Sequence, residues 1–170
     1  SVATQSLSLS VGSHTQPLCE QCSQMTRWIV IGAGPCGLGS VARLLDAGCE
    51  VTWIDPEFGV GRMGKHYRNV PSNTTNGDLI KGLDIPRALD FRACQARRRD
   101  SGVAGVDGAM EAVTVMADLP PSACSSLGLF VDVLEEGCAL LLDRREVQAV
   151  RGWATELVGE QGSWRVTVRR

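Results

Sequence analysis

The chain has little net charge, few aromatic side chains and no long apolar run. Its 170 residues carry 17 Lys and Arg against 19 Asp and Glu, and aromatic residues make up 5%. The basic residues are scattered apart from Arg97, Arg98 and Arg99, which is unlike the electrostatic footprint of a nucleic-acid-binding protein. No apolar segment approaches the roughly 20 residues that span a bilayer. We therefore expect a soluble chain with no nucleic-acid partner and no direct membrane span.

Histidine is scarce and the cysteines are irregularly spaced, which restricts metal and acid–base chemistry. The two histidines are His14 and His66. Seven cysteines is an odd number without the spacing of a secreted disulfide framework, so we expect a reducing intracellular compartment. Cys19 and Cys22 form a CxxC pair, but no second CxxC or histidine pair supplies the other ligands of a zinc site. No metal site is expected.

The amino-terminal stretch is rich in Ser, Thr and Gln, and its first eighteen residues contain no charged group. We expect residues 1–26 to form a flexible tail that is ordered only by contact with other protein subunits. The chain begins with Ser1 and not with Met. The serine-rich character is compatible with the remains of a targeting segment for a plastid or a mitochondrion.

The segment from Trp28 to Asp55, WIVIGAGPCGLGSVARLLDAGCEVTWID, has the order strand, glycine turn, helix, strand. Trp28 to Ile31 predicts a strand buried on both faces. One helix face is predicted by the i, i+3, i+4, i+7 spacing of Leu38, Val41, Ala42 and Leu45. Gly48 is a natural stop for this helix, and Glu50 to Ile54 predicts a second strand. The segment therefore predicts a βαβ unit.

The glycines of this turn and the acid after the second strand suit a dinucleotide. Gly32 permits the tight turn, Gly34 leaves space for a pyrophosphate, and Gly37 lets the helix pack closely on the strand. Pro35 suits the first helical turn, whose free N–H groups and positive dipole end favour phosphate. Asp55 can accept hydrogen bonds from both hydroxyls of an adenosine ribose. The alternative is a vestigial site whose glycines persist only because the turn needs them.

A second glycine stretch, GVGRMG, contains Gly59, Gly61 and Gly64 and also fits GxGxxG. It follows no new strand, and we expect it to open no helix. We interpret it as a flexible loop in which the glycines and Arg62 lie against the phosphates or adenosine of the same cofactor.

GAGPCGL, its downstream acid, the glycine and arginine loop and HYRNVPSNT together resemble the amino-terminal FAD-binding part of oxidoreductases with two dinucleotide-binding domains. Flavin monooxygenase-like and pyridine nucleotide-disulfide oxidoreductase-like proteins belong to this group. The resemblance implies FAD as cofactor, and it places Tyr67, Asn73 and Thr74 near the isoalloxazine ring. Asn73 is then the candidate catalytic residue that hydrogen-bonds a reactive flavin intermediate, while Asn76 stands near the position of the family's lysine. The residues from Pro71 to Gly77 by themselves equally predict a polar turn.

The remainder of the chain is expected to complete a single domain, residues 27–170, within the usual size of one core. Leu127 to Leu142 predicts one or two amphipathic helices after the Pro120–Pro121 break. Gly159 to Gly162 predicts a turn between two carboxyl-terminal strands. We expect a nucleotide-binding βαβ unit with its loop over residues 27–82 and a mainly helical insertion over residues 83–145. A β-hairpin or small meander is expected over residues 146–170. The predicted fold class is α/β with a Rossmann-like unit.

Compared with a full two-domain flavoprotein, the predicted fold is incomplete. In the family, the meander is followed by an Ala-Thr-Gly turn, a second GxGxxG for NAD(P)H and a late Gly-Asp, and none of these follows the carboxyl-terminal strands predicted here. We therefore expect part of a longer enzyme or a shortened relative. The leading hypothesis is an FAD-binding oxidoreductase domain in which the flavin does the redox chemistry on a substrate that the sequence does not identify. One alternative is a non-catalytic structural or accessory subunit of a larger redox or photosynthetic assembly, organellar and membrane-associated, with a vestigial FAD fold; another is an NAD-binding module.

Overall fold

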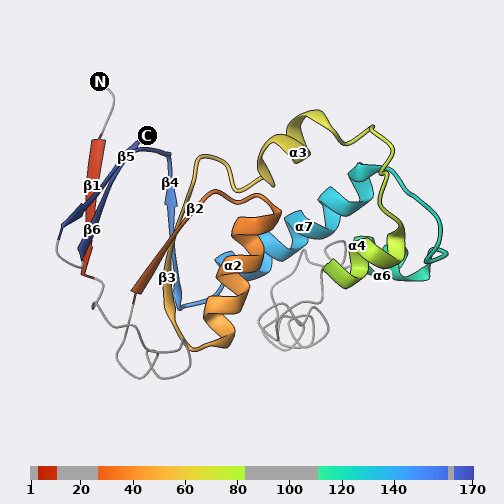
Figure 1. Cartoon of the computed structure of the whole chain (residues 1–170), viewed down its shortest axis with the longest axis horizontal. Helices are drawn as coiled ribbons and strands as arrows, with labels where there is room; N and C mark the ends of the chain where they lie inside the picture. Colours follow the sequence, from red (N-terminus) through yellow and green to blue (C-terminus); the bar gives the residue numbers. More distant parts are fainter. Residues whose placement is uncertain (1–3, 11–26, 83–110, 161–162) are drawn as a thin grey trace, which may run out of the picture.

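The computed structural model describes residues 4–10, 27–82, 111–160 and 163–170. The chain is mixed α/β, with two three-stranded sheets and a group of helices in successive layers (Figure 1). The strands are β1 (Thr4–Ser10), β2 (Arg27–Ile31), β3 (Glu50–Asp55), β4 (Val147–Arg151), β5 (Trp153–Glu160) and β6 (Ser163–Arg169). The helices are α2 (Pro35–Asp46), α3 (Gly61–His66), α4 (Asn76–Gly82), α6 (Glu111–Asp118) and α7 (Leu127–Leu142). Within the described ranges, no helix is long and apolar enough to cross a membrane.

The middle layer is a parallel sheet with the strand order β2-β3-β4. Strand β2, helix α2 and strand β3 form the βαβ unit that the sequence predicts, and α2 ends two residues before Gly48. The central strand β3 is buried from Val51 to Asp55. Strand β2 has a ladder with β3 alone among the described strands, and Ile31 is 50% exposed. The expectation that Trp28 to Ile31 is buried on both faces is therefore wrong. Hydrophobicity shows that a strand is partly buried but not where it lies in the sheet.

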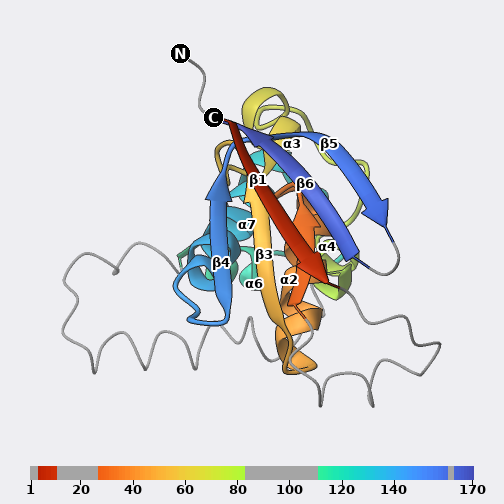
Figure 2. The same cartoon turned by 90° about the vertical axis from the view of Figure 1, so that its left-hand side faces the viewer.

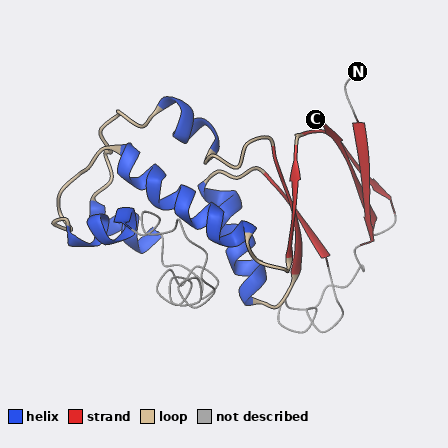
Figure 3. Cartoon of the chain, turned by 180° about the vertical axis from the view of Figure 1, so that it is seen from behind, coloured by secondary structure: helices blue, strands red, loops and turns tan. Residues whose placement is uncertain are grey.

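Helices cover one face of the parallel sheet (Figure 3). The four residues predicted as the buried face of α2 are all buried, and they pack with side chains from β3 and α7. The core on this side includes Trp53, Val131, Leu134 and Leu141, all nearly or fully inaccessible. Leu127 to Leu142 is one helix, as its pattern predicts. The first part of the predicted helical insertion, residues 83–110, lies outside the described residues.

The antiparallel sheet β1-β6-β5 lies against the other face of the parallel sheet (Figure 2). Val166 and Val168 of β6 pack on Ile54 and Val150 of the parallel sheet. The predicted carboxyl-terminal hairpin is present as β5 and β6, while β4, at the start of the same region, joins the parallel sheet.

The amino-terminal residues 4–10 form β1 and pair with β6 along its whole length, from Thr4 opposite Arg169 to Ser10 opposite Ser163. The expectation of a flexible tail over residues 1–26 is therefore wrong for this part. An uncharged segment has weak local preferences, and the edge of β6 offers it backbone hydrogen bonds that its own sequence does not reveal. Residues 1–3 and 11–26 lie outside the described residues.

Candidate functional site

The glycine turn between β2 and α2 contains three glycines in different environments. Gly32 has a φ of +96°, which L-residues with side chains rarely adopt. A Cβ on Gly37 would lie 2.0 Å from the carbonyl oxygen of Gly32, so the helix can approach the strand only if this residue is glycine. A Cβ on Gly34 would meet nothing within 4 Å. The turn therefore requires glycine at two positions, and at the third it leaves open space.

Helix α2 begins at this open space. Its N-cap is Gly34 and Pro35 occupies the first turn, as the sequence predicts for the residue after the glycine. The helix start has no side-chain cap, and its first turn contains no acidic residue. First-turn N–H groups have no acceptor within a helix, and the positive end of the dipole adds to their attraction for an anion. No side chain of the first turn itself therefore compensates this end of α2.

Trp53 holds the glycine turn from beneath. Its side chain is fully buried, and its indole Nε1–H donates to the carbonyl oxygen of Gly32 at 2.9 Å. The N–H of Gly32 donates in turn to Ile54 at 2.8 Å. The sequence pattern predicts Trp53 only as a strand residue. A signal for this further role was present, because a buried tryptophan usually finds an acceptor for its N–H group.

The Asp55 carboxylate joins two loops at the carboxyl edge of the parallel sheet. Its side chain is nearly buried, and Oδ2 accepts the N–H of Ala33 in the glycine turn at 2.8 Å. Oδ1 accepts the N–H groups of Glu57 and Phe58 at 2.8 and 2.6 Å. These bonds fill Oδ1 and leave acceptor capacity on Oδ2. The ribose contact predicted for Asp55 remains a prediction, alongside a structural role that the sequence did not indicate.

The second glycine stretch opens a helix, α3, so the expectation that it opens none is wrong. A Cβ on Gly64 would lie 2.3 Å from the carbonyl oxygen of Gly59. This close approach joins residues five apart in sequence, as does that between Gly32 and Gly37. Gly64 therefore lets a short helix pack on its own loop, which explains the repeated spacing without a second nucleotide.

Two buried residues of this loop have left-handed backbone conformations. Phe58 and Val60 have φ values of 57° and 58°, and a β-branched residue in this region is a strong outlier. Such a conformation costs on the order of 1–3 kcal/mol per residue and persists only where the surroundings enforce it.

Contacts with neighbouring side chains hold Phe58 in place. Its ring packs edge-on against Trp53 with centroids 5.1 Å apart, and the Arg151 guanidinium lies over the Phe58 ring, 5.3 Å from its centroid. Arg151 also donates to the carbonyl oxygen of Glu57 at 3.0 Å.

Cys138 of α7 lies beneath the glycine turn, with its Sγ 3.9 Å from the carbonyl oxygen of Ala33. Burial, together with the negative charges of Asp55 and Glu135, raises the pKa of this thiol to about 12. The thiol therefore stays protonated at neutral pH and acts as a small apolar group in the core.

The residues predicted to lie near a flavin ring are not next to the glycine turn. Asn73 and Thr74 are exposed in the segment that joins α3 to α4, at the end of α7 far from the sheets (Figure 1). This segment is tied to the start of α7, where the N–H of Leu127 donates to Val70 at 2.9 Å. Leu127 and Cys138 are separated by about 16 Å along the helix at a rise of about 1.5 Å per residue. Only an elongated ligand reaches both places.

Other side chains of this region are exposed or structural. Arg62 is exposed on α3, and Tyr67, at the end of that helix, is 48% exposed. Ser72 is buried, and its Oγ accepts the N–H of Thr74 at 3.0 Å, as in a polar turn. Asn76, near the position of the family's lysine, is fully buried and donates from Nδ2 to Pro120 at 3.2 Å. Throughout the described segments, no group of three or more His, Cys, Asp and Glu side chains is placed to hold a metal ion.

Comparison with known proteins gives one short similarity. The chain is 50% identical over 48 residues to Monooxygenase AgnR1 of Paecilomyces divaricatus. The matched residues are 27% of this chain and 12% of the fungal protein. No protein-family model matches the chain, and no solved structure matches it. Part of this chain is thus similar to a monooxygenase, which points to redox chemistry in general terms.

Proposed function

We propose that this chain is an FAD-binding oxidoreductase domain built on a Rossmann-like unit. The observation that carries the proposal is the glycine at position 34. Gly34 has a φ of −69°, which any residue adopts, and a Cβ there would meet nothing within 4 Å. Neither backbone conformation nor packing therefore explains this glycine, whereas both explain its neighbours. Gly34 is the N-cap of α2, a position that Ser, Thr, Asp or Asn fills at least as well. What glycine adds at this helix start is an open approach to the backbone, and a pyrophosphate is what such an opening admits.

The surroundings of Gly34 fit a dinucleotide phosphate. The uncapped first turn of α2, from Pro35 onward, offers N–H donors and a positive dipole end. Asp55 has acceptor capacity left on Oδ2 for a ribose hydroxyl, and the exposed Arg62 can offset phosphate charge. FAD, when bound, would supply the redox chemistry itself. Tyr67, Asn73 and Thr74 are then proposed to face the flavin end of an elongated cofactor. The partial similarity to a monooxygenase supports redox chemistry, which a bound flavin would supply.

One observation favours a second candidate, a non-catalytic subunit that retains the fold. The Asp55 carboxylate already accepts three backbone N–H groups, and Gly32, Gly37 and Gly64 have structural reasons to be glycine. Most of the fingerprint is therefore needed even without a cofactor. Gly34 bears most directly on the choice between the two candidates, because neither its packing nor its backbone conformation requires glycine.

The proposal is tested by alkylation of Cys36 with iodoacetamide in the presence and absence of FAD. Cys36 is exposed in the first turn of α2, so bound pyrophosphate would cover it. At an FAD concentration ten times the Kd, the rate of Cys36 alkylation should fall about tenfold, because it is proportional to the fraction of molecules whose site is empty. Peptide mass spectrometry provides the measurement, because cleavage after Arg27 and Arg43 gives a peptide whose only cysteine is Cys36.

Two other cysteines are internal controls for this experiment. Cys124 is exposed far from the glycine turn in sequence, and its rate should not change with FAD. Cys138 is buried with a pKa raised to about 12, and it should stay unlabelled at pH 8 in both samples. Equal labelling of Cys36 with and without saturating FAD would argue against a cofactor at the turn.

A further inference from the structure

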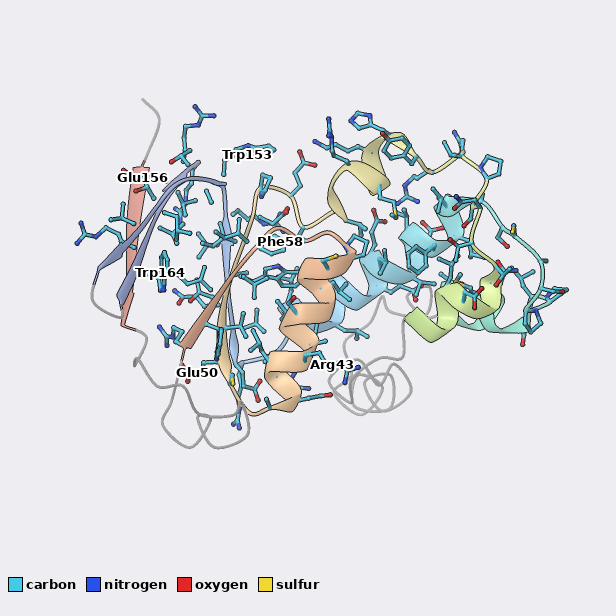
Figure 4. All side chains as sticks on the ribbon, in the orientation of Figure 1. Arg43, Glu50, Phe58, Trp153, Glu156 and Trp164 are labelled. Carbon is cyan, nitrogen blue, oxygen red and sulfur yellow. The ribbon has the colours of Figure 1, made fainter. Side chains whose placement is uncertain are left out.

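Trp153 is a large aromatic side chain exposed at the carboxyl edge of the parallel sheet. It is 58% exposed, at the point where β4 passes into β5. The preceding residue, Gly152, donates its N–H to the carbonyl oxygen of Asp55 at 3.2 Å. Figure 4 shows Trp153 just past the carboxyl end of β4, on the side where Phe58 lies. Trp153 is therefore a close neighbour of the acid proposed to hold the ribose.

The order of the strands gives a bound dinucleotide a direction along this edge. The glycine turn follows β2, Asp55 ends β3, and Arg151 ends β4 as the register partner of Asp55. Ligands of open parallel sheets bind across the carboxyl ends of the strands. A ligand with its pyrophosphate at the turn and its ribose at Asp55 has its base one strand farther on. That place is the end of β4, next to Trp153.

The other aromatic rings of this region are less suited to contact a base. Phe58, at the same edge, is 6% exposed, and its ring packs on Trp53 and lies under Arg151. Trp164 is 45% exposed, but it lies elsewhere on β6, where its ring packs against Gly159. Trp153 combines an exposed ring with a position beside Asp55.

We propose that Trp153 is the platform on which the adenine base of the dinucleotide stacks. This inference rests on the proposed function and adds to it a residue that recognises the base. Every purine has a π-face that stacks on indole, and removal of such a platform typically weakens binding about 5- to 150-fold. Trp153 thereby makes the site select a ligand with a base over pyrophosphate alone.

The test measures binding of FAD, ADP and inorganic pyrophosphate to the whole chain and to three variants. Trp153→Ala should weaken the binding of FAD and of ADP by the same factor, within the range of about 5- to 150-fold. Its affinity for pyrophosphate should be unchanged. Trp153→Phe keeps a stacking ring, so its affinities for FAD, ADP and pyrophosphate should all stay within about threefold of those of the parent protein. Trp164→Phe is the matched control, and it should not alter any of the affinities.

Tryptophan fluorescence gives a readout that does not depend on the alanine variant being well folded. ADP does not absorb the emission, so stacking of its adenine should quench Trp153 directly. Quenching should occur in the parent protein and in Trp164→Phe, and it should be lost in Trp153→Phe.

The outcomes separate this inference from the proposed function. If Trp153→Ala binds FAD and ADP as the parent protein does, Trp153 is not the platform, and the cofactor proposal stands. If ADP quenching persists in Trp153→Phe, the inference is likewise overturned. If the parent protein binds neither FAD nor ADP, both the proposed function and this inference are contradicted.

Discussion

Replacement of Gly34 by glutamate is expected to abolish FAD binding while the protein stays folded. The new Cβ meets nothing within 4 Å, and the φ of −69° suits any residue. The substitution therefore introduces no steric clash at Cβ and no backbone strain that would destabilise the fold. An acid at a helix N-cap even interacts favourably with the dipole. Its carboxylate, however, lies where the pyrophosphate would bind. Two like charges 4 Å apart repel by about 4 kcal/mol at an intermediate dielectric, which corresponds to roughly a thousandfold loss of affinity.

Gly39→Glu is a matched control for this variant. Gly39 lies in the same helix, a Cβ added there would also meet nothing within 4 Å, and the variant acquires the same charge farther from the turn. FAD titration of both variants, with circular dichroism to confirm folding, makes the comparison. Gly39→Glu should bind FAD within a fewfold of the parent protein. A Gly34→Glu protein that retains the parent's affinity would remove the observation on which the proposed function rests.

Replacement of Gly37 by alanine is expected to destabilise the fold itself. The added Cβ would lie 2.0 Å from the carbonyl oxygen of Gly32, which is a backbone atom. This oxygen cannot easily move, because it accepts the Trp53 indole N–H at 2.9 Å and the N–H of Gly32 is bonded to Ile54. Overpacking of this kind costs about 1–3 kcal/mol or more. At roughly 2–4 °C per kcal/mol for a domain of this size, Tm should fall by about 2–12 °C.

Gly39→Ala is the control for this stability measurement. It makes the same change in the same helix, where the added methyl group meets no neighbour, and alanine favours a helix by up to about 1 kcal/mol over glycine. Thermal unfolding followed by circular dichroism should therefore show opposite shifts for the two variants. Equal Tm values would mean that the close approach of α2 to the strand is not as the structure has it.

The features that the sequence predicted depend on local signals. The spacing of Leu38, Val41, Ala42 and Leu45 predicts the buried face of α2, and the apolar pattern of residues 127–142 predicts α7. The tight turn at Gly32 and the close packing at Gly37 follow from the absence of a side chain. Each of these can be judged from a few neighbouring residues, which is why the βαβ unit was predicted correctly.

The features that it missed depend on neighbours distant in the chain. The edge position of β2 follows from the order of three strands, and β1 forms because β6, at the other end of the chain, offers it an edge. The bonds of the Asp55 carboxylate to two loops, and that of Trp53 to Gly32, appear only when these loops meet. The helix after Gly61 was missed because the spacing of Gly59 and Gly64 is typical of a nucleotide-binding turn, whereas here it serves packing.

The most direct test of the cofactor proposal is the absorption spectrum of whatever small molecule heat releases from the natively purified chain. Release of a flavin in stoichiometric amount, identified as FAD, is the predicted result. It would establish that the chain holds a flavin, as the open space at Gly34 and the uncapped start of α2 lead us to expect. A chain that releases no flavin and takes up no added FAD would contradict the proposal and leave the scaffold as the better account.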